Sequence, residues 1–263
     1  MAAWWNRFWF GPASARAYAA HRVLLGVFLL WYFGGFWPHV ELLFSRDGIY
    51  LPVLLPDFAP PPAVAWGVYL LTLAACALLV AGWRTVYVAP AVFVLFTYHY
   101  LLSIAGRDTS YDRLIVLMLL FGSFAPAARG RKHVSGFAAR LLCFQVAALY
   151  FGSGLWKLVN PRWHDGKLLE MVLIGPWGTD AGRWVVNLGW SGGVYSLLGW
   201  SVIVLELALG PALYMRRLRI PAMVIGLGFH ISVWVFLQIP EFLVCVTVYP
   251  LYFAWRSVPH PDL

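Results

Sequence analysis

Long apolar runs recur along the whole chain and restrict what it can fold into. One of them, ending in "LYFGSGLWKL", has no charged residue between Arg140 and Lys157. A helix needs about 17–25 mostly apolar residues to cross a bilayer. The chain is 62% hydrophobic and 11% charged, whereas a soluble domain carries about 25% charged residues. So few charges cannot cover a water-soluble fold, and we predict an integral membrane protein.

The apolar runs predict an all-α, polytopic membrane bundle that forms a single domain over residues 1–263. We expect about eight transmembrane helices, of which the fourth and the last are short, at residues 19–37, 63–82, 86–105, 113–127, 138–157, 194–214, 221–238 and 240–255. Two long segments, 38–62 and 158–193, connect spans on the outer side. Their tryptophans favour short helices that lie in the membrane interface.

The positions of the charges predict the orientation. On this topology the inner side holds eleven cations, Arg7, Arg16, Arg84, Arg129, Arg131, Lys132, Arg140, Arg216, Arg217, Arg219 and Arg256. The outer side holds seven, Arg46, Arg107, Arg113, Lys157, Arg162, Lys167 and Arg183. Because cytoplasmic loops carry an excess of Lys and Arg, we expect both termini in the cytoplasm, in a bacterial inner membrane. The same rule accounts for the net charge of +8, so no nucleic-acid partner is expected.

Three isolated cysteines, Cys76, Cys143 and Cys245, lie inside apolar runs. Their spacing supports neither a disulfide nor a metal site, and buried thiols acting as small hydrophobic residues explain them best. We therefore predict no metal centre.

Polar residues inside the spans are the candidate functional residues, because each charge in a membrane costs about 2.5–3.5 kcal/mol on insertion scales. Lys157 ends the fifth span, and Tyr150 and Ser153 lie on the same helical face. A lysine at a helix end can also simply extend to the headgroups. Glu206 lies near mid-membrane, where we expect it to be protonated or paired.

Further polar residues fall in the outer half of the predicted bundle. They are His99 of "FTYHYLL", His230 of "GLGFHISVWVF", and Asp108, Tyr111 and Asp112 of "GRDTSYDRL". Hydrogen bonds between helices explain the histidines equally well, and loop solvation explains the aspartates. Together with Lys157 these residues suggest a polar pocket that opens outward.

The lysine segment resembles a known signature. "YFGSGLWKL" followed by "WHDG" is similar to the Y-F-x-[AS]-G-x-x-K-L…W-x-x-G pattern of the vitamin K-dependent gamma-carboxylase family, whose membrane part is the HTTM (horizontally transferred transmembrane) domain. "AHRVLLGVFLLWYF", "FSRDGIYLP" and "FHISVWVFLQIPEF" extend the resemblance from about residue 14 to 255. We expect a short form that lacks the soluble domain of the animal carboxylases.

The resemblance implies a function and a site. Its best-known member oxygenates reduced vitamin K to an epoxide and uses the energy to form a strong base. That base removes a proton from a glutamate side chain, to which carbon dioxide adds. The resemblance places the catalytic lysine at Lys157 and a family histidine at His230. A histidine of the family's "NHDYL"-like segment is replaced by Tyr111.

The chemistry of the residues agrees with this implication. An amine among apolar side chains loses its proton more easily than one in water, because burial disfavours the charged form. Such an amine can act as general base toward a lipid quinol, which reaches the site through the bilayer. The expected cofactor is therefore reduced vitamin K or another quinol, with carbon dioxide and oxygen as co-substrates. The alternatives are a non-enzymatic assembly or peptide-maturation partner, and a small transporter with Glu206 as its proton site.

Overall fold

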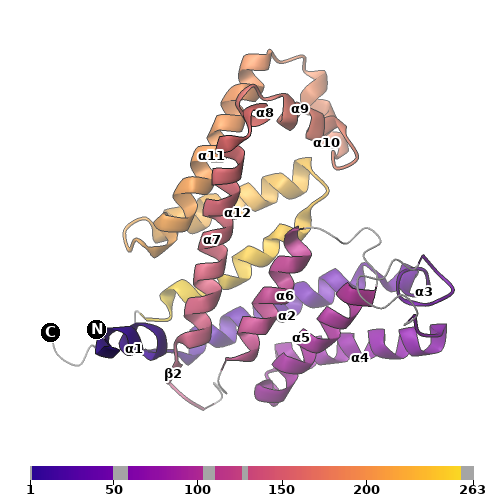
Figure 1. Ribbon diagram of the computed structural model, residues 1–263, viewed down its shortest axis with the longest axis vertical. Helices are drawn as coiled ribbons and strands as arrows, with labels where there is room; N and C mark the ends of the chain where they lie inside the picture. The colour runs from indigo at the N-terminus through magenta and orange to yellow at the C-terminus, as the bar shows by residue number, and fades with distance from the viewer. Residues whose placement is uncertain (1, 50–58, 103–109, 126–129, 256–263) are drawn as a thin grey trace. The chain divides into compact units, whose positions relative to one another are not determined.

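The computed structural model describes residues 2–49, 59–102, 110–125 and 130–255. Asp108 and the cations Arg107, Arg129 and Arg256 of the orientation prediction lie outside this part of the chain. Helices dominate what is described (Figure 1). The elements are α1 (Ala2–Phe10), β1 (Pro12–Ser14), α2 (Ala15–Gly34), η1 (Trp37–His39), α3 (Val40–Phe44), α4 (Pro62–Ala81), α5 (Thr85–Leu102), α6 (Ser110–Ser123), β2 (His133–Ser135), α7 (Phe137–Val159), α8 (Pro161–His164), α9 (Lys167–Ile174), α10 (Asp180–Asn187), α11 (Gly192–Tyr214), α12 (Arg219–Phe236) and η2 (Pro240–Phe253).

Each of the predicted apolar segments contains a helix within its described residues. Within the described residues six helices, α2, α4, α5, α7, α11 and α12, are long and apolar enough to cross a membrane. The two segments expected to be short are α6 and η2, with 14 residues each. An α-helix of that length advances about 21 Å at 1.5 Å per residue. Because a 3₁₀ helix rises about 2.0 Å per residue, η2 extends about 28 Å. The all-α polytopic membrane fold is confirmed.

Local sequence explains where these helices begin and end. Pro62 is the first residue of α4, where its missing N–H is not needed, and Gly82 follows its last residue with a φ of 72°. Large apolar side chains remain exposed along the long helices, among them Leu71, Val94, Leu197, Val204 and Val224. Since a soluble fold would bury most of these side chains, their exposure fits helices that face lipid.

The chain divides into two compact units. Unit 1 comprises Met1–Leu142 and Pro250–Leu263, and unit 2 comprises Cys143–Tyr249. Each is described separately below. That the two form one domain stays a prediction.

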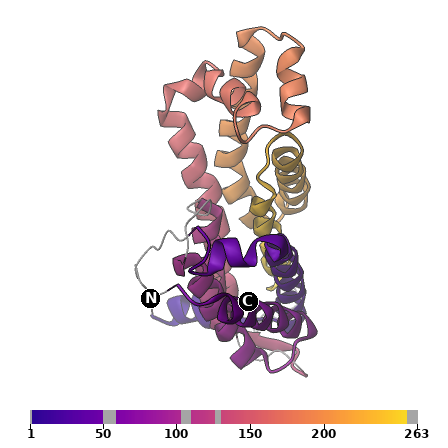
Figure 2. The ribbon, with the colours of Figure 1, turned by 90° about the vertical axis from the view of Figure 1, so that its right-hand side faces the viewer.

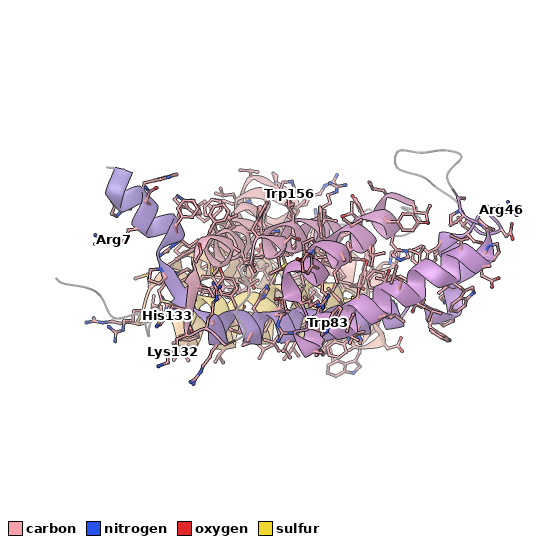
Figure 3. All side chains as sticks on the ribbon, turned by 90° about the horizontal axis from the view of Figure 1, so that it is seen from below. Arg7, Arg46, Trp83, Lys132, His133 and Trp156 are labelled. Atoms are coloured by element: carbon pink, nitrogen blue, oxygen red, sulfur yellow. The ribbon has the colours of Figure 1, made fainter. Side chains whose placement is uncertain are left out.

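In unit 1, helices α2, α4, α5 and α6 pack one against the next in chain order. Aromatic rings fill the space between them: Phe33 contacts both Tyr69 and Phe96, and the Tyr69 hydroxyl donates to the Phe33 carbonyl oxygen at 2.6 Å. A two-stranded antiparallel sheet, which the sequence did not predict, pairs β1 with β2. Figure 3 shows Arg7, Lys132 and His133 at one end of this unit and Arg46 at the other.

In unit 2, α11 packs against α12 and also contacts the short helices α8 and α9. The short helices α8, α9 and α10 gather at one end of the unit in both views (Figures 1 and 2). The short helices predicted for residues 158–193 are therefore present, while their position in a membrane interface stays a prediction. Cys76 in unit 1 and Cys143 and Cys245 in unit 2 are buried, as predicted.

Candidate functional site

Lys157 lies two residues before the end of α7, and its side chain turns back along the helix. Its Nζ donates to the Ser153 Oγ, one turn earlier, at 2.7 Å. Side chains of an α-helix lean toward its N-terminus, so a lysine near the C-terminus reaches the preceding turn without strain. The ammonium group therefore does not extend past the helix end, as it would in a lysine that only reaches for the headgroups.

Glu206 supplies the opposite charge. Its Oε2 lies 2.7 Å from the Lys157 Nζ, and the two side chains are only 12% and 7% exposed. Glu206 is in the middle of α11, where neither helix end can stabilise a carboxylate. The expectation that it is protonated or paired is confirmed as pairing. Because the pair has no net charge, its burial costs less than that of either ion alone.

Small residues let α7 and α11 approach closely enough for this contact. A Cβ on Gly154 would fall 2.9 Å from both the backbone nitrogen and the Cγ of Leu207, next to Glu206. Further along, a Cβ on Gly210 would fall 2.7 Å from the Ala147 carbonyl oxygen. The two helices run side by side in both ribbon views (Figures 1 and 2). The glycine of the lysine signature therefore sets the distance between the helices that carry the ion pair.

The second half of the signature folds back onto the same lysine. Asn160 caps α8 by accepting from the Arg162 backbone N–H at 3.2 Å. This turn places the Trp163 ring centroid 5.0 Å from the Lys157 Nζ, within range of a cation–π contact. Gly166 has a φ of 75°, and a Cβ there would fall 2.4 Å from the backbone of Tyr195. Thus both halves of the signature meet at the beginning and middle of α11.

A second polar cluster lies within unit 2. The Tyr150 hydroxyl is 2.6 Å from the His230 Nε2 and 3.1 Å from the Tyr249 hydroxyl, and all three residues are buried. The three groups form one continuous hydrogen-bonded chain, in which each bond polarises the next. The Nδ1 of His230 is buried and has no hydrogen-bond partner among the described residues.

The structure separates the predicted site residues into groups. Lys157, Ser153 and Glu206 form one cluster, and Tyr150 and His230 belong to the other. The remaining candidates are in unit 1, where His99 Nε2 is 3.1 Å from the Thr72 Oγ1 and the Tyr32 hydroxyl donates to the Asp112 Oδ1 at 2.5 Å. Tyr111 is buried beside Asp112 on α6. A single outward pocket that joins both units stays a prediction.

Sequence reasoning missed the roles of Trp163 and Tyr249. Trp163 belongs to the "WHDG" segment, so the signature already marked it, although nothing local indicates that its ring covers a lysine. The only feature of the sequence that could have indicated a role for Tyr249 is its hydroxyl group inside an apolar run. The Trp163 Nε1 is buried without a hydrogen-bond partner in the described part of the chain. It is a polar atom of a ring that contacts the lysine.

The fold and the site together define a class. This is a polytopic helical membrane protein whose spans enclose a lysine–glutamate ion pair and a tyrosine–histidine–tyrosine cluster. The HTTM domain model matches residues 10–256, nearly the whole chain, and the protein belongs to the HTTM domain family. This domain occurs in proteins related to vitamin K-dependent carboxylases. The chain matches no curated protein and no solved structure.

Proposed function

We propose that the protein is a membrane enzyme that takes a lipid quinol, in the manner of the vitamin K-dependent carboxylases, with Lys157 as the base. The observation that carries this proposal is the buried contact between Lys157, Ser153 and Glu206. A purely structural lysine at a helix end would extend into the headgroup layer at little cost. Here it turns inward against a carboxylate that the opposite helix presents.

The residues around the pair fit a quinol. A quinol is flat and apolar, with two hydroxyl groups, so it needs an aromatic surface and polar atoms that are free to bind oxygen. Trp163 supplies a ring beside the ammonium group. The buried Trp163 Nε1 has no described partner, and neither has the buried Nδ1 of His230 in the separate tyrosine–histidine–tyrosine cluster. Unsatisfied buried polar atoms are costly unless a ligand or water occupies them.

The ion pair gives the site a way to store and move one proton. Transfer of a proton from the Lys157 Nζ to the Glu206 carboxylate leaves a neutral amine and a neutral acid, with no change in net charge. The amine can then take the proton of a quinol hydroxyl, and the resulting ammonium lies beside the oxygen anion. Ser153 holds the Nζ in place throughout. The quinol, with oxygen, would supply the oxidation that drives carbon dioxide addition to an acceptor.

Replacement of the lysine by arginine tests this proposal. Lys157→Arg keeps the positive charge beside Glu206, so the fold should persist, but a guanidinium does not give up its proton. We expect oxidation of phylloquinol or menaquinol by the protein in lipid nanodiscs to fall at least about 100-fold, the lower range of general acid–base contributions. Lys167→Arg is the matched control, because that lysine side chain is 76% exposed on α9.

Two results would contradict the proposal. One is turnover of the Lys157→Arg variant at the rate of the wild type. The other is a wild-type protein that neither binds nor oxidises either quinol. The ion pair would then serve helix packing, as in a non-enzymatic assembly partner.

A further inference from the structure

A cavity of about 410 Å³ lies within unit 1. Its walls come from the first turns of α2 and α5, the last turns of α4 and α6, and the first turns of α7. Its volume falls within the roughly 300–1,000 Å³ of small-molecule sites. All of its lining residues belong to unit 1, so it is separate from the Lys157 site.

Three of the described residues that line this cavity are arginines, Arg16, Arg22 and Arg131, and none of the described lining residues is acidic. Arg16 and Arg131 are exposed, and neither forms an ion pair with any carboxylate that the structure describes. A concave wall that carries one sign of charge concentrates its field and attracts counter-ions. The cavity therefore favours an anion.

Arg22 is held in the wall by the end of a neighbouring helix. Its Nη1 donates to the carbonyl oxygens of Leu79 and Val80, the latter at 2.7 Å. These are among the last carbonyls of α4, which lack partners in their own helix. Gly82 leaves room for the guanidinium, since a Cβ there would fall 2.9 Å from its central carbon. A guanidinium has five N–H donors, so Arg22 keeps donors on its other nitrogens for a ligand.

The lining changes from basic to apolar along α2. Tyr18, Arg22 and Leu25 are spaced three and four residues apart on one face of the helix. Beyond Arg22 the wall is formed by Leu25, Leu79 and other aliphatic side chains. In the predicted topology Arg16 and Arg131 are on the cytoplasmic side, at the depth of the inner headgroups. The wall thus matches a molecule with an anionic head and an apolar chain.

We propose that this cavity binds the phosphate group of an anionic phospholipid, with its acyl chain along the apolar wall. Arg16 and Arg131 contact the phosphate oxygens. Arg22 contacts them from further along α2, next to the apolar part of the wall. Arginine suits this role because its fork of N–H donors matches phosphate geometry. A free phosphate monoester presents the same oxygens but has no acyl chain. A comparison of ligands with and without an acyl chain therefore distinguishes a lipid from a water-soluble phosphate.

Binding of dioctanoyl phosphatidylglycerol, followed by native mass spectrometry in a neutral detergent, tests the proposal. The wild type should bind it more tightly than dioctanoyl phosphatidylcholine. The Arg16→Gln/Arg131→Gln variant should bind it at least about tenfold more weakly, because two hydrogen bonds to a charged group are lost. The Arg216→Gln/Arg217→Gln variant is the matched control, since it also removes two exposed cations but outside the cavity.

A second variant fills the cavity without changing any charge. Gly122 lines the cavity, and a Cβ at this position would meet no atom within 4 Å. Gly122→Leu should therefore fold and should exclude the lipid. Equal affinity of Gly122→Leu and wild type for phosphatidylglycerol would overturn the proposal. So would an equal loss of affinity in the two double arginine variants. A wild type that binds phosphatidylglycerol no more tightly than phosphatidylcholine would overturn it as well. Glycerol 3-phosphate that binds as tightly as the lipid would overturn the lipid assignment and leave a phosphate site for a water-soluble ligand.

Discussion

The two units bury a carboxylate in different ways. In unit 1, Asp112 is 1% exposed, lies in the first turn of α6 and accepts from the Tyr32 hydroxyl. The N-terminus of a helix favours a negative charge, so the helix that carries Asp112 contributes to its stabilisation. In unit 2, Glu206 lies in the middle of α11 and bonds to an ammonium group 49 residues away in sequence.

This difference indicates which carboxylate is suited to chemistry. Asp112 has the N-terminus of its own helix in addition to the Tyr32 hydroxyl. Glu206 depends on Lys157, and both groups can exchange a proton. A site that must bind and release protons is served by such a pair. A helix N-terminus instead favours the charged form of its carboxylate and so opposes protonation.

The largest expected loss of stability comes from removing one partner of the ion pair. Glu206→Leu leaves the Lys157 ammonium buried without its carboxylate, and removal of one partner of a buried pair costs about 3–5 kcal/mol. Lys157→Met combined with Glu206→Leu removes both charges and should recover most of that loss. Unfolding of the three proteins in the same detergent measures the difference. If the single variant is no less stable than the double variant, the two residues do not compensate each other.

A smaller effect is expected from the glycines of the signature. Gly154→Ala places a methyl group 2.9 Å from the Leu207 backbone nitrogen, and overpacking of this kind costs about 1–3 kcal/mol. It should also separate α7 from α11 and weaken the contact between Lys157 and Glu206. Gly152→Ala is the matched control: its Cβ would meet no atom within 4 Å, so it should be neutral or stabilise the helix by about 0.5–1 kcal/mol.

Unfolding measurements and quinol turnover, taken together, check this pair of variants. The prediction is wrong if Gly152→Ala and Gly154→Ala have the same stability and the same turnover.

The smallest effect is expected at Asp112. Tyr32→Phe removes the hydroxyl that donates to the Asp112 Oδ1, and loss of a hydrogen bond to a charged group costs about 1.5 kcal/mol at the low end. The helix N-terminus continues to stabilise the carboxylate, so the loss should stay well below that of Glu206→Leu. Quinol turnover should not change. A loss of stability as large as that of Glu206→Leu would show that the two carboxylates are held in the same way.

Local sequence was sufficient for some features of the site. The spacing of four residues between Ser153 and Lys157 places both on one helical face, and the structure joins them by a hydrogen bond. The position of Glu206 inside an apolar run predicted that it needs a partner. The same reasoning placed Tyr150 beside Lys157, yet the structure shows its hydroxyl bonded to His230 and Tyr249.

The sequence by itself determined that the protein is a helical membrane protein, where its long apolar helices lie to within a few residues and which family it belongs to. Apolar length, prolines, glycines and a local signature carry that information, because they act on the chain within a few turns. Only the tertiary structure decided that Glu206 is the partner of Lys157, that Trp163 covers the ammonium and that Tyr249 joins His230 through Tyr150. These contacts depend on which helix faces reach each other, and on distances of a few ångströms that small residues such as Gly154 permit.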